Sequence, residues 1–124
     1  MPQYQGTGHV VSPHDSAFAA YLDAACWSSY DDERGEELYA DRLTDEAVEK
    51  MREDWEDFCK ANAEDIEVDL LQAAHDFWLT RNRHGAGFWD GHWPQDVADR
   101  LTKSAHAYGE VYLQADDDGN IHVY

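Results

Sequence analysis

The sequence predicts a mainly helical α+β domain with about four helices and a small C-terminal β-hairpin. Apolar residues recur at helical spacing in four stretches between residues 12 and 108. Near the C-terminus, apolar and polar residues alternate on both sides of "DDDGN", a pattern typical of a hairpin. At 124 residues the chain is expected to form a single domain, 1–124, that folds without a metal, cofactor or disulfide.

The first helix is expected over residues 12–29, after an irregular arm or edge strand over residues 1–12. Ser12 or Asp15 can serve as its N-cap. Residues 30–43 are expected to form a long loop with one helical turn. The inward face of this helix should carry Phe18, Tyr21, Leu22, Ala25 and Cys26.

Thr44 is a good N-cap for a second helix, because acidic residues follow it and favour the positive end of the helix dipole. A third helix is expected over residues 64–82, with Gly85 ending it in the left-handed conformation. The inward residues should be Val48, Met51, Trp55, Phe58 and Cys59 on the second helix, and Ile66, Leu70, Ala73 or Ala74, and Phe77 on the third. Both cysteines are expected to be free and buried.

A fourth helix is predicted from Pro94 to Tyr108, closed by Gly109. The terminal hairpin should occupy residues 110–124. The inward face of the fourth helix should carry Val97, Leu101, Ala105 and Tyr108.

The charge of the chain restricts its partners. Asp and Glu number 27 against 9 Lys and Arg, which gives a net charge of -18. That charge repels phosphate backbones, so direct nucleic-acid binding is disfavoured, whereas a partner with a basic surface is favoured. Because no signal peptide or membrane-spanning apolar run is visible, we expect a soluble, cytoplasmic protein without membrane contact. Composition gives no oligomeric state.

The acidity is concentrated between residues 31 and 69, where 17 acidic residues face 5 basic ones. One interpretation is that these are the solvated faces of amphipathic helices. The other is a surface that mimics the charge of a nucleic acid and binds a basic groove on another protein. Self-repulsion at this charge costs stability, which favours a functional use. A generally acidic host proteome would produce the same composition.

The segment "HDFWLTRNRHGAGFWDGHW", residues 75–93, is the densest candidate for a functional surface. In a continuous helix its polar side chains in the last turn would lie beside the following loop and not beneath it. Arg81 would also lie near the negative end of the helix dipole. The predicted binding residues are His75, Asp76, Trp78, Arg81, Asn82, His84, Trp89, Asp90 and Trp93.

Three interpretations of this segment stay open. In the first, Arg81, Trp89 and Trp93 anchor a protein interface. In the second, it forms a small-molecule or hydrolytic site, in which Arg81 with Asn82 holds a phosphate or carboxylate and His84 is the acid or base. In the third, it is only a structural clasp between two helices. A metal site is not expected, because the His and Asp spacing matches no compact ligand motif.

The motifs "HDFWLTRNRHGAGFWD", "DRLTKSAHAYGEVYL" and "DDDGNIHVY" resemble a family of small acidic proteins encoded by bacteriophages and phage-derived islands. The resemblance covers residues 75–124, with a weaker similarity at "FAAYLDAACWSS". The chain departs from the family at Arg83, where Gly is usual, and at "GHWP". The resemblance implies a phage protein that binds or inhibits a host protein in the host cytoplasm, and it implies no particular reaction.

Overall fold

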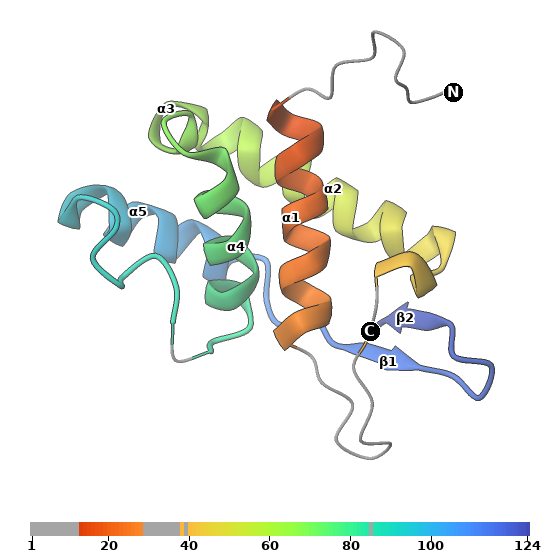
Figure 1. Ribbon diagram of the computed structural model, residues 1–124. Helices are drawn as coiled ribbons and strands as arrows, with labels where there is room; N and C mark the ends of the chain where they lie inside the picture. The colour runs from red at the N-terminus through yellow and green to blue at the C-terminus, as the bar shows by residue number, and fades with distance from the viewer. Residues whose placement is uncertain (1–12, 29–37, 39, 85) are drawn as a thin grey trace, which may run out of the picture.

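The computed structural model describes residues 13–28, 38, 40–84 and 86–124 (Figure 1). It confirms the predicted mainly helical α+β class. The expectations for the arm over residues 1–12, for Ser12 and for Gly85 lie outside the described residues. The elements are α1 (Pro13–Ser28), the 3-10 turn η1 (Ala40–Arg42), α2 (Asp45–Ala61), α3 (Ala63–Ile66), α4 (Leu70–Arg81), α5 (Gln95–His106), β1 (Leu113–Ala115) and β2 (Ile121–Val123).

Helices α1 and α4 lie side by side in the same direction, and α2 crosses behind α1 (Figure 1). Aromatic rings fill the space between them. The Phe77 ring of α4 stacks on Phe58 of α2, with 4.2 Å between ring centroids, and on Tyr21 of α1 at 5.3 Å. Such pairs stabilise a core beyond their buried area. Both cysteines are free and buried, as predicted.

The predicted start of α2 is confirmed at Thr44, whose Oγ1 accepts a hydrogen bond from the Ala47 backbone N–H at 3.1 Å. The predicted inward residues are confirmed, except that five of them are only partly buried: Leu22, Val48, Leu70, Val97 and Tyr108. The buried face of α2 consists of Ala47, Met51, Trp55, Phe58 and Cys59.

The single third helix predicted over residues 64–82 is wrong, because the structure divides it into α3 and α4. Asp69 causes the division: its Oδ1 accepts a hydrogen bond from the Gln72 backbone N–H at 3.1 Å and thereby caps a new helix. Val68, between the two helices, is 84% exposed. The apolar period continues through the break, so periodicity alone did not reveal it.

Helix α4 ends at Arg81, and Arg83, two residues further on, takes the left-handed conformation that terminates it. Arg83 has a φ of 55°, in the left-handed region that favours glycine. Its backbone N–H donates to the Thr80 carbonyl at 3.0 Å, and the His84 N–H donates to the Leu79 carbonyl at 3.0 Å. These two bonds form a Schellman motif.

Helix α5 begins after Pro94 as predicted, but it ends at His106, two residues before the predicted Tyr108, and Gly109 follows with a φ of 75°. The hairpin pairs β1 with β2 in antiparallel register, with Gln114 opposite His122. Asp116 Oδ1 shapes the turn by accepting from the backbone N–H groups of residues 118 and 120. The Arg42 guanidinium donates to the carbonyls of residues 118 and 119, which attaches the hairpin to η1.

Candidate functional site

The guanidinium of Arg81 lies at the centre of the domain, with only 1% of the residue exposed. It donates to the Asp54 carboxylate of α2 at 2.8 Å and to the Tyr21 hydroxyl of α1 at 3.0 Å. It also donates to the carbonyls of Tyr108 and Gly109, which follow α5, at 3.2 and 3.0 Å. One side chain thus joins α1, α2, α4 and the end of α5, and its charge is compensated by these partners.

The surroundings of Arg81 are those of a structural centre. Burial raises the pKa of Tyr21 to about 12, although the adjacent guanidinium opposes this shift, so the phenol stays protonated at neutral pH. The Phe77 and Tyr108 rings lie 5.4 and 5.8 Å from the guanidinium carbon. The expectation that Arg81 lies exposed beside the loop is therefore wrong, because partners on three other segments surround it.

Asp76 is also buried, contrary to expectation. Its Oδ2 accepts from Trp93 Nε1 at 2.8 Å, and its Oδ1 accepts from Gln72 Nε2 at 3.1 Å. Burial raises the pKa of Asp76, since the two hydrogen bonds compensate only part of the desolvation of its charge. Trp93 is 5% exposed and packs against Phe88, so it belongs to the core.

The 86–93 loop is tied to α4 at two further points. The Phe88 backbone N–H donates to Thr80 Oγ1 at 3.1 Å, and His92 Nε2 lies 3.0 Å from Asp69 Oδ2. A Cβ added at Gly87 would lie 2.4 Å from Thr80 Oγ1, so glycine allows the loop its close approach. Asp69, Asp76 and Thr80 lie at successive levels of α4, and the loop is attached along the length of the helix. This arrangement agrees with the clasp interpretation.

Few of the predicted binding residues remain at the surface. Trp78 is buried, and its Nε1 donates to Ser28 Oγ at 2.6 Å. Asn82 is half-buried and its Oδ1 accepts from the Val111 backbone N–H at 2.8 Å. His84 and Asp90 are exposed, and Asp90 Oδ2 accepts from the Gly87 N–H at 3.0 Å within its own loop.

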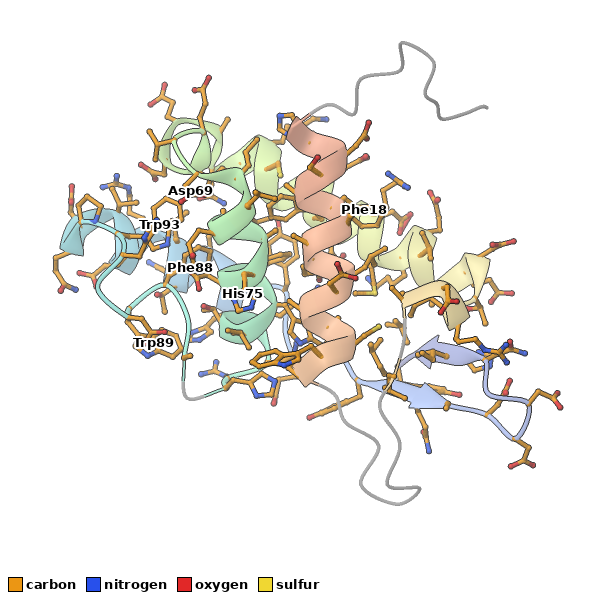
Figure 2. All side chains as sticks on the ribbon, in the orientation of Figure 1. Phe18, Asp69, His75, Phe88, Trp89 and Trp93 are labelled. Atoms are coloured by element: carbon orange, nitrogen blue, oxygen red, sulfur yellow. The ribbon has the colours of Figure 1, made fainter. Side chains whose placement is uncertain are left out.

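Trp89 is 42% exposed at the outer edge of the 86–93 loop, whereas Phe88 and Trp93 lie between the loop and α4 (Figure 2). His75 is half-buried and lies next to Trp27, with 6.0 Å between ring centroids. Trp27 is 73% exposed and was missed from the sequence. Its position just outside the apolar stripe of α1 is the signal that could have revealed it.

The polar candidates do not converge on one pocket. His75, Asp76, Arg81 and Asp90 have separate surroundings, while Asn82 and His84 line a pocket of about 240 Å³. The other residues that line it are Ser28, Trp78, Val111, Tyr112 and Leu113. No carboxylate, Lys or Arg is among the described residues that line this pocket beside His84, so it offers no acid–base pair for hydrolysis.

The outward face of α2 carries a row of exposed acidic side chains. Its exposed carboxylates follow one another at spacings of one, three and four residues, so they share one side of the helix. In the described part of the chain, none of them makes a side-chain hydrogen bond or an ion pair. These residues are Asp45, Glu46, Glu49, Glu53 and Glu56.

Among the described residues, no group of three or more His, Cys, Asp or Glu side chains could hold a metal ion. No helix in the described ranges is both long and apolar enough to cross a membrane. Comparison of the chain with protein-family models, curated proteins and solved structures finds no match.

Proposed function

We propose that the protein is an acidic interaction protein that binds a partner with a basic surface through the outward face of α2. The observation that carries this proposal is the row of five exposed carboxylates on that face without an ion-pair partner among the described residues. Like charges three and four residues apart destabilise a helix. A basic partner would relieve this repulsion, and the interaction would also accelerate association.

The resemblance of residues 75–124 to phage proteins extends the proposal. It suggests that the partner is a host protein, and that the acidic face occupies a groove that otherwise holds a nucleic acid. Trp89 remains available as an exposed aromatic anchor. Arg81 and Trp93 are not part of this proposal, because a side chain buried in the domain core has no surface to offer a partner.

The test compares two variants of equal net charge. The first neutralises one stripe of α2 through Glu46→Gln, Glu49→Gln and Glu53→Gln. The second neutralises three exposed carboxylates on other elements through Glu64→Gln, Asp99→Asn and Glu110→Gln. The wild type and both variants are immobilised, and bacterial lysate is passed over each of them at low and at moderate salt. Proteins that are retained are then eluted with duplex DNA.

We expect the wild type and the second variant to retain a basic protein that duplex DNA elutes. The α2 variant should bind that protein about tenfold more weakly at low salt, since three exposed ion pairs contribute on the order of 1.4 kcal/mol together. If both variants retain the basic protein equally, its binding depends on the net charge of the chain and not on the α2 face. Failure of duplex DNA to elute the protein would contradict nucleic-acid mimicry.

A further inference from the structure

A groove between the first half of α1 and the second half of α2 lies outside the predicted segment, and of the acidic face only Glu56 borders it. It consists of two adjoining cavities of about 350 and 170 Å³ that share His14, Cys59 and Ala63. Phe18, labelled in Figure 2 on the side of α1 next to α2, lines the larger cavity. The larger volume is within the range of small-molecule sites in proteins.

Both cavities of the groove contain apolar side chains. Phe18 and Trp55 line the larger cavity, and Ile66 and Leu70 line the smaller one. The shared residues Cys59 and Ala63 lie at the junction. An elongated apolar ligand could therefore extend from one cavity into the other.

The larger cavity carries two of the nine Lys and Arg residues of the chain, Arg52 and Lys60. The Arg52 guanidinium lies 4.3 Å from the centre of the Phe18 ring. Within the described part of the chain, neither cation has a carboxylate within ion-pair distance, although acidic residues outnumber basic ones threefold. Asp15 and Glu56 also line this cavity, and Glu67 lines the smaller one. Arg52 and Lys60 thus both lie at the end of the groove that the larger cavity forms.

We propose that this groove binds a small amphipathic anion, a medium-chain fatty carboxylate. Its carboxylate contacts Arg52 and Lys60, and its chain runs over Cys59 and Ala63 towards Ile66 and Leu70. A guanidinium already stacked on an aromatic ring loses little freedom when it binds a carboxylate. The apolar lining favours an acyl chain over a hydrophilic anion such as inorganic phosphate.

Sodium decanoate below its micellar concentration is the probe, and decanol and decyltrimethylammonium are the neutral and cationic controls. Binding to the full chain is measured by calorimetry. Decanoate should bind at least tenfold more tightly than either control. Arg52→Gln should weaken decanoate about tenfold, the loss of one charge-assisted hydrogen bond. The matched variant Arg83→Gln, which removes an exposed arginine beyond α4, should leave affinity unchanged.

Alkylation of the two cysteines locates the ligand. Burial raises the pKa of Cys59 to about 12 and that of Cys26 to about 11, so both thiols react slowly with iodoacetamide, and mass spectrometry can follow each separately. Decanoate should slow the alkylation of Cys59 and not that of Cys26, which does not line the groove.

A second variant does not depend on Arg52. Ala63→Leu, at an exposed position, narrows the junction and should abolish both decanoate binding and Cys59 protection while circular dichroism stays unchanged. Equal binding of decanoate and decanol, or equal protection of the two cysteines, would overturn the proposal. These readouts do not involve the α2 stripe, so they are independent of the proposed function.

Discussion

Replacing Arg81 by methionine tests the structural centre of the domain. Methionine keeps the length and helix propensity of the side chain and removes its charge. The substitution removes the donor to the Tyr21 hydroxyl and to Asp54 Oδ2, and it leaves the Asp54 carboxylate, which is 13% exposed, only its ion pair with Lys50 at 3.2 Å. It also deprives the carbonyls of Tyr108 and Gly109 of their donor. Removing one partner of a buried ion pair costs about 3–5 kcal/mol. Because Asp54 retains some solvent contact, we expect a loss of about 3 kcal/mol in the free energy of unfolding.

Urea unfolding followed by circular dichroism measures this loss, with Arg83→Met as the exposed control at an expected cost within about 0.5 kcal/mol. Asp54→Asn in both backgrounds completes a double-mutant cycle. The second substitution should cost less in the Arg81→Met background, since the carboxylate then has only its solvent-exposed ion pair with Lys50 to lose, with a coupling energy of at least about 1 kcal/mol. A loss below about 1 kcal/mol for Arg81→Met, or zero coupling, would refute the central role of Arg81.

Two further substitutions test the strain at the end of α4 and the buried acid beside it. Arg83→Gly should raise the free energy of unfolding by about 1 kcal/mol in urea titrations, because glycine adopts the left-handed conformation of this position without the steric strain of a side chain. A loss of stability would contradict the role of residue 83 in ending α4. Asp76→Asn should stabilise the protein at pH 7 but not at pH 3, as measured by melting at the two values. The folded-state pKa of Asp76 is raised, so the wild type loses stability as pH rises from the unfolded pKa through the folded one, and the amide does not. An equal effect at both values would show that the charge of Asp76 carries no penalty. Asp76→Ala, which leaves the Trp93 Nε1 unpaired, should instead cost about 1–3 kcal/mol.

Local patterns predicted the helices that depend on local causes. Thr44 caps α2 because its hydroxyl reaches a backbone N–H three residues ahead, and only the neighbouring sequence is needed to foresee that. Asp69 acts in the same way, but the apolar period continues across it and concealed the break. The aspartate directly before "LLQAA" was the signal for a new helix start.

The candidate site was less predictable because its contacts are distant in sequence. Asp54 lies 27 residues from Arg81, and Tyr21 lies 60 residues from it. The helical pattern correctly assigns Arg81 to the last turn of a helix. It does not reveal that three other segments meet at this side chain. The free cations of the groove, Arg52 and Lys60, were missed for the same reason, since the cavity exists only once α1 lies against α2.

The division between buried and exposed members of residues 75–93 determines how mutations in this segment are interpreted. Trp93 donates to the buried Asp76 carboxylate, so its truncation would loosen the 86–93 loop and reduce binding at any surface indirectly. Trp89 has 42% of its surface exposed and no hydrogen bond to another described residue, so its truncation removes a contact surface at little cost to the fold. A loss of partner binding on substitution of Trp89 that leaves the melting temperature unchanged therefore reports on an interface. The same loss on substitution of Trp93 or Arg81 reports on the stability of the domain that presents it.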